Sequence, residues 1–160
     1  MNPVVAVCGP GNATAEEAAL AEAVGVGLAR AGATLVCGGL GGAMDAAARG
    51  AAAAGGLVIG ILPGETRDGA SAHLTVGLPT GLGEARNALV VRAADAVIAV
   101  AGEYGTLSEI GLALKLGRPV IGLGTWRLSH DRRPDLPDPI ERADSPEEAV
   151  RLAIRRVSPR

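Results

Sequence analysis

Residues 33–44 read Ala-Thr-Leu-Val-Cys-Gly-Gly-Leu-Gly-Gly-Ala-Met, a short apolar run that stops at two pairs of glycines. The run over 33–37 is rich in aliphatic residues, which is typical of a buried strand. An alanine-rich stretch over about 43–54 follows and predicts a helix that ends at Gly55. A strand, a glycine-rich loop and a helix in this order form the unit from which α/β sheets are built.

The same alternation continues along the chain. Further strands are predicted at 3–8, 57–62, 73–77, 95–100 and 119–123. Further helices are predicted at 14–31, 81–94, 106–117 and 146–157. Thr14 and Glu17 fit a capping box, and Ser145 followed by Pro146 fits a helix start. Strands separated by helices predict one α/β domain over residues 1–160 with a mainly parallel sheet, in which 127–139 form an exposed loop.

The composition of the 160 residues argues against several classes of protein. A net charge of −2 disfavours a basic protein that coats nucleic acid, and Tyr104 and Trp126 are the only aromatic residues available for base stacking. No apolar stretch reaches the roughly 18 residues of a membrane span, and the N-terminus lacks the pattern of a signal peptide. We therefore expect a cytoplasmic protein without a nucleic-acid or membrane partner.

Cysteine and histidine are sparse. Cys8 and Cys37 are too few for a disulfide framework, and each ends a predicted strand. We expect both to be small buried residues, although a thiol pair is an alternative. His73 and His130 fall in separate loops without a cluster of ligands, so we predict no metal site.

Glycine-rich segments follow three predicted strands and precede three predicted helices, at 9–12, 38–42 and 101–106. Glycine lets the backbone approach a ligand closely, and a helix N-terminus presents free N–H groups. Ligands of parallel sheets lie beyond the carboxyl ends of the strands. The three segments therefore predict a phosphate, nucleotide or other anion at one edge of the sheet, against the alternative of three tight turns.

Two common nucleotide motifs are disfavoured. Thr14 stands where a dinucleotide-binding fingerprint has its third glycine, and Gly38 stands where it has an acidic residue for the ribose. No Gly-Lys-Ser or Gly-Lys-Thr follows any of the loops, which argues against a P-loop nucleotide triphosphatase.

Glu109 and Arg86 are the candidate catalytic residues. Glu109 lies three residues after Thr106, where a carboxylate could either face the ligand or simply complement the helix dipole. Arg86 opens a predicted apolar helix, and its alternative role is that of a solvated helix end.

These residues also carry a resemblance to a known family. Gly38 to Met44 resembles the glycine loop of the LONELY GUY (LOG) or "lysine decarboxylase-like" family. The segment from Gly102 to Glu109 resembles its Pro-Gly-Gly-x-Gly-Thr-x-x-Glu motif, and Arg86 falls at its Arg-Lys pair. The resemblance covers most of 3–125, and the molybdenum cofactor carrier proteins are similar as well.

The resemblance implies a Rossmann-like, three-layer αβα fold and a site for a nucleoside 5′-monophosphate. It implies N-glycosidic hydrolysis to free base and ribose 5-phosphate, without a cofactor or metal and without lysine decarboxylation. Glu109 would stabilise the oxocarbenium-like transition state, and Arg86 would hold the phosphate or polarise the leaving group. The implied phosphate- and nucleotide-binding residues are Gly9, Gly11, Asn12, Gly39, Gly41, Gly42, Met44, Gly102, Gly105 and Thr106.

The sequence departs from the LOG pattern at Ala101, Glu103 and Asn87. These departures weaken the expectation of hydrolysis more than that of the fold. The leading expectation is binding of a nucleoside 5′-monophosphate or a related phosphorylated ligand, with hydrolysis as a further step. The alternative is a non-catalytic carrier or sensor of a phosphorylated pterin or nucleotide. A carrier of a simple oxyanion is a third alternative. The apolar helix at 88–94, together with the resemblance, predicts a homodimer or a higher homo-oligomer.

Overall fold

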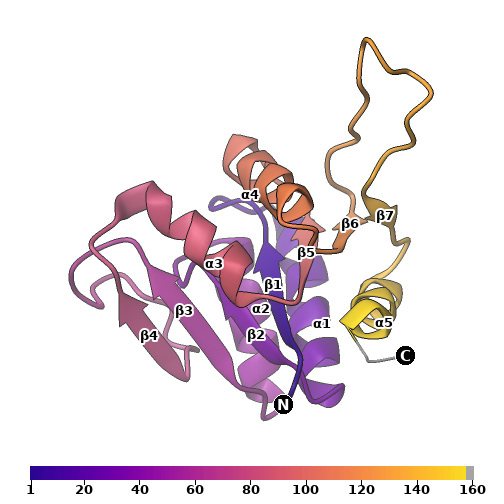
Figure 1. Cartoon of the computed structure of the whole chain (residues 1–160). Helices are drawn as coiled ribbons and strands as arrows, with labels where there is room; N and C mark the ends of the chain where they lie inside the picture. The colour runs from indigo at the N-terminus through magenta and orange to yellow at the C-terminus, as the bar shows by residue number, and fades with distance from the viewer. Residues whose placement is uncertain (158–160) are drawn as a thin grey trace.

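A seven-stranded sheet organises residues 1–157, the part of the chain that this computed structural model describes (Figure 1). The strands follow the order β4-β3-β2-β1-β5-β6-β7, and all neighbours are parallel. Their bounds are β1 Val4–Cys8, β2 Thr34–Cys37, β3 Val58–Leu62, β4 Val76–Pro79, β5 Ala96–Val100, β6 Val120–Leu123 and β7 Glu141–Arg142. The sheet confirms the predicted α/β, Rossmann-like fold.

Helices cover both faces of the sheet and complete three layers. One face carries α1 (Ala15–Arg30), α2 (Ala43–Ala53) and α5 (Pro146–Val157). The other face carries the short 3-10 helix η1 (Gly83–Arg86), α3 (Asn87–Ala93) and α4 (Tyr104–Lys115). Each face of the sheet has its own core, built mainly of Ala, Val, Leu and Ile, because the chain offers almost no aromatic residues to fill one.

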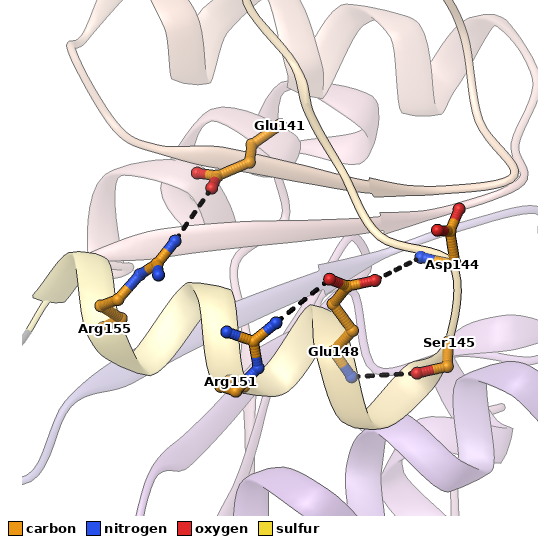
Figure 2. Close-up of polar contacts among 6 residues, drawn as sticks. All are labelled: Glu141, Asp144, Ser145, Glu148, Arg151 and Arg155. Atoms are coloured by element: carbon orange, nitrogen blue, oxygen red, sulfur yellow. Dashed lines mark hydrogen bonds and ion pairs between the residues drawn. The ribbon is translucent and has the colours of Figure 1, made fainter.

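Two of the predicted helix starts, those of α1 and α5, have side-chain caps. Thr14 and Glu17 form the complete capping box ahead of α1. At the start of α5 the Ser145 hydroxyl accepts the Glu148 N–H at 3.1 Å (Figure 2). The Glu148 carboxylate accepts the Asp144 N–H at 2.9 Å and also pairs with Arg151 (Figure 2). These contacts satisfy backbone donors that a helix leaves free at its first turn.

The prediction of one continuous helix over 81–94 is wrong. The structure divides it into η1 and α3 and leaves 81–82 outside both. Gly81 and Gly83 have φ angles of 65° and 56°, which lie outside the α-helical region. The chain therefore reaches η1 by a turn, and this turn brings Arg86 toward the sheet.

Two other elements have different bounds from those predicted, and one strand is additional. The strand predicted at 73–77 lies at 76–79, and the helix predicted at 106–117 begins two residues earlier. β7 was not predicted, because it pairs with β6 at only two positions and shows no apolar alternation. The predicted loop 127–139 contains no helix or strand and projects away from the sheet between β6 and β7 (Figure 1).

Candidate functional site

The candidate site lies where the order of the sheet reverses. β1 stands between β2 and β5, and the three glycine loops follow these three adjacent strands. Such a reversal leaves a crevice beyond the carboxyl ends of the strands, where α/β proteins bind their ligands. The crevice here is a cavity of about 400 Å³ lined by Gly9, Gly11, Leu40, Met44, Pro63, Gly83, Glu84, Arg86, Asn87, Gly105, Thr106 and Glu109.

The cavity unites both candidate catalytic residues with five of the other predicted residues. Those in the lining are Arg86, Glu109, Gly9, Gly11, Met44, Gly105 and Thr106. The predicted residues outside the lining are Asn12, Gly39, Gly41, Gly42 and Gly102. Asn12 is exposed, and Gly39 packs against the sheet at Gly60 and Leu62.

Gly42 shows why a glycine in these loops need not face a ligand. A Cβ at this position would collide with the carbonyl oxygens of Pro10 and Gly11, and its φ of 65° is one that other residues rarely adopt. Gly42 thus lets the loops after β1 and β2 pack against each other. The Ala43 N–H donates to the Pro10 carbonyl at 3.0 Å and joins the two loops directly.

Arg86 lies almost buried at the cavity wall, with 7% of its surface exposed. Its Nη1 donates to the Asn87 side-chain oxygen, whereas its Nε is buried and has no hydrogen-bond partner within residues 1–157. An unpaired buried donor is costly, and the guanidinium brings a positive charge to the wall of the cavity, where an anionic ligand would be attracted. Arg86 is therefore not a solvated helix end, which was the alternative role considered from the sequence.

Glu109 is also buried, with 8% of its surface exposed. Burial raises the pKa of its carboxyl to about 7, against smaller lowering effects of a hydrogen bond from Cys8 and of the Arg86 charge. Because α4 begins at Tyr104, Glu109 lies in the second turn, where the helix dipole no longer accounts for a carboxyl group. Its position beside Arg86 and the cavity needs another explanation.

The two cysteines are buried on opposite faces of the sheet. Ala6 of β1 pairs with Val36 of β2, so Cys37 lies level with Val7 and one position out of step with Cys8. Cys8 packs on the α3/α4 face beside Glu109, and Cys37 packs in the α1/α2 core. Burial raises the pKa of the Cys37 thiol to about 11 and that of Cys8 well above its usual value. Both are free thiols, as the buried interpretation predicted.

The loop between β5 and α4 is held from the side of β6. The Thr125 hydroxyl donates to the carbonyl of Ala101, which has a φ of 47°. The Trp126 indole N–H donates to the Glu103 carbonyl at 3.2 Å, and its ring lies 5.7 Å from that of Tyr104. The Glu103 side chain is exposed and outside the cavity lining, so its charge does not oppose a ligand there.

Sequence reasoning missed several residues of the cavity. Leu40, Pro63, Gly83, Glu84 and Asn87 line it as well. Gly38 lies behind the wall, because a Cβ there would come within 2.7 Å of both Nη atoms of Arg86 and 2.6 Å of the Met44 sulfur. The adjacency of Asn87 to Arg86 was a usable signal, whereas Pro63 and Leu40 depend on the tertiary fold.

The cavity combines a guanidinium, residues of all three glycine loops and an apolar side formed by Leu40, Met44 and Pro63. This arrangement suits a ligand with an anionic end and a flat or apolar end. Within residues 1–157 no helix is both long and apolar enough to cross a membrane.

Comparisons with known proteins agree with this architecture. An uncharacterized protein of Archaeoglobus fulgidus is 39% identical over 150 residues, which are 94% of this chain and 93% of that protein. The molybdenum cofactor binding protein of Rippkaea orientalis is 35% identical with a TM-score of 0.89, over 99% of both chains. The Moco carrier protein of Chlamydomonas reinhardtii is 30% identical with a TM-score of 0.85, over 98% of both chains.

The family model with the description "SLOG cluster4 family" matches residues 2–150. That range contains the whole sheet and every residue of the cavity lining. Its extent agrees with the resemblance to LOG-like proteins and to molybdenum cofactor carriers. The chain belongs to the SLOG cluster4 family.

Proposed function

We propose that the protein is a non-catalytic carrier of the molybdenum cofactor, a phosphorylated pterin, and that it holds this cargo in the cavity at the carboxyl edge of the sheet. The similarity to the Rippkaea orientalis protein, which extends over 99% of both chains, carries the proposal. Two buried free thiols suit a reducing compartment, so we place the carrier in the cytoplasm. The net charge of −2 and the two aromatic residues argue against a nucleic-acid partner.

The cavity offers a partner for each part of such a cargo. Arg86 brings a positive charge to the cavity for a phosphate group, and the backbone at Gly9, Gly11 and Gly105 can supplement it with N–H groups. The apolar side formed by Leu40, Met44 and Pro63 offers contact area to a flat ring. A volume of about 400 Å³ is in the range of small-ligand sites.

Loading of the purified chain tests the carrier proposal. The protein is incubated with molybdenum cofactor released from a molybdoenzyme, desalted, and analysed for molybdenum by mass spectrometry. We expect the wild type to retain molybdenum and to gain thermal stability in calorimetry, and Arg86→Ala to retain little. A folded wild-type protein that retains no more molybdenum than Arg86→Ala would contradict the proposal.

Hydrolysis of a nucleoside 5′-monophosphate is the second candidate function. The observation in its favour is that Arg86 and Glu109 line one cavity, as glycosidic cleavage of a phosphorylated substrate requires. Incubation with AMP and cytokinin riboside monophosphates, followed by chromatography of free base, tests it. Release by the wild type and loss in Glu109→Ala would support hydrolysis, and no release by either would exclude it for these substrates.

A further inference from the structure

The charges around the cavity are unfavourable for an anion if every acidic group is ionised. Arg86 is the one cationic side chain in the lining, whereas Glu84 and Glu109 are both acidic. With both carboxyls ionised the lining carries a net negative charge, which repels a phosphate. Protonation of one carboxyl would remove the excess and leave Arg86 free to attract the ligand.

Glu109 is the carboxyl group that can hold such a proton. Glu84 is exposed to solvent, whereas Glu109 is buried among the apolar residues of the α3/α4 face. The side-chain hydrogen bond to Glu109 comes from the thiol of Cys8, a weak donor. Arg86 acts on Glu109 through its charge and makes no hydrogen bond to it.

The groups that act on Glu109 come from three elements besides its own. Cys8 of β1 and Arg86 of η1 lie on its side of the sheet. Cys37 of β2 lies on the opposite face and interacts with Glu109 only electrostatically. Both thiols are buried and have raised pKa values, so they stay neutral near pH 7. Arg86 therefore remains the one charge on this side that favours the carboxylate, and it is also the group that an anionic ligand would engage.

We propose that Glu109 meets the anionic group of the ligand as a neutral carboxylic acid, donating its O–H to an anion oxygen, so that capture takes up one proton from solvent. The proposal rests on the proposed binding function and adds a role for Glu109 within it. A bound anion would also weaken the hold of Arg86 on the carboxylate, which strengthens the coupling. The pKa of about 7 places the change in the neutral range, where small shifts in pH alter affinity.

This role is opposite to the one that hydrolysis would need. A hydrolase uses the ionised carboxylate to stabilise positive charge in its transition state. A carrier whose Glu109 is protonated when loaded holds its cargo without supplying that charge. Loss of the proton from Glu109 would then favour release of the cargo.

Sulfate is a suitable probe, because it is tetrahedral and keeps its charge from pH 6 to pH 8, whereas phosphate titrates within this range. Isothermal titration of the wild type with sodium sulfate is carried out at pH 6, 7 and 8 in two buffers of different ionisation enthalpy. We expect affinity to fall about tenfold from pH 6 to pH 8, with uptake of about one proton per sulfate at pH 8.

Two glutamine variants give the matched comparison. Glu109→Gln keeps a neutral hydrogen-bond donor, so it should bind sulfate with an affinity that no longer depends on pH. Glu84→Gln removes the exposed carboxyl of the same cavity and should keep the pH slope of the wild type. Circular dichroism checks that both variants fold, and carbon-13 NMR of labelled Glu109 with and without sulfate gives the protonation state directly if Glu109→Gln does not fold.

Several results would overturn the proposal: a wild-type affinity that is flat from pH 6 to pH 8, an unchanged slope in Glu109→Gln, an NMR shift that shows an ionised Glu109 in the sulfate complex, or no sulfate binding at all. Retention of molybdenum by the wild type at a single pH is a separate measurement. If the sulfate titration gives one of these results while the wild type retains molybdenum, the protonated Glu109 is rejected and the carrier function stands.

Discussion

Gly38 decides where the Arg86 guanidinium can lie. Both Nη atoms occupy the space that a side chain at position 38 would fill, and Asn87 holds the guanidinium from its other side. The backbone of Gly38 contributes nothing to the cavity lining itself. Its importance for binding would therefore be indirect, through the position of a charge.

Gly38→Ala should weaken sulfate binding by about tenfold, since displacing Arg86 forfeits a charge-assisted hydrogen bond worth about 1.5 kcal/mol. The cost in stability should be small, because the atoms in the way are the ends of the flexible Arg86 and Met44 side chains. Calorimetric titration and chemical denaturation measure the two effects. A large loss of stability, or an unchanged affinity, would contradict this account.

Glu109 should make stability depend on pH. Its folded pKa of about 7 exceeds the ordinary value of 4.5, so its favourable contribution is complete below about pH 4.5 and is lost as pH rises through 7. Relative to Glu109→Gln, the wild type should lose on the order of 3 kcal/mol of unfolding free energy between pH 4.5 and pH 8. Urea denaturation of both proteins at several pH values tests this, and a constant difference between them would refute it.

The packing of α1 against α2 depends on two glycines at the contact. A Cβ at Gly25 would collide with the Ala47 carbonyl, and one at Gly50 would collide with that of Glu22. The two helices therefore approach backbone to backbone. In a core without buried aromatic side chains, this close contact supplies packing that aromatic residues provide elsewhere.

Gly25→Ala should destabilise the fold by about 2 kcal/mol, because backbone cannot move aside as a side-chain end can. Gly111→Ala is the matched control: Gly111 also lies in a helix, α4, but a Cβ there meets nothing within 4 Å. The control should gain about 0.5–1 kcal/mol from helix propensity. Equal changes in the two variants, measured by urea denaturation, would argue against the close contact.

The elements that could be predicted from sequence are those fixed by local pattern. The apolar runs ending at Cys8 and Cys37 and the caps at Thr14 and Ser145 are local features, and the structure reproduces them. The break at Gly83 was missed because the apolar pattern after Asn87 resembled one continuous helix. Burial of Arg86 and Glu109 depends on how η1 and α4 meet the sheet, and no local pattern reports it.

At the scale of the whole molecule, exposed apolar side chains lie on β4, on the turn that follows it and on α3. Leu78, Leu82 and Leu89 are exposed to 45%, 51% and 39%. The predicted homodimer rests on the apolar helix α3 and on the family resemblance, and these leucines are candidates for its interface. Light scattering after size exclusion should give about twice the chain mass of 15.9 kDa.

Leu89→Asp should shift that mass to the monomer, because a charge on α3 would have to be buried in the interface. Leu136→Asp, on the loop 127–139, is the control and should leave the mass unchanged. A wild-type mass near 16 kDa would reject the dimer, and a Leu89→Asp protein that remains dimeric would place the interface elsewhere.

The contact between Trp126 and the loop ahead of α4 gives the chain a natural optical reporter. Trp126 is the only tryptophan, and its indole N–H is bonded to Glu103, two residues before Gly105 of the cavity lining. Any ligand that moves this loop must change the polarity and hydrogen bonding of the indole, and with them its emission wavelength and lifetime. Binding and dissociation of such a ligand can thus be followed in real time by intrinsic fluorescence, in the unlabelled wild-type protein.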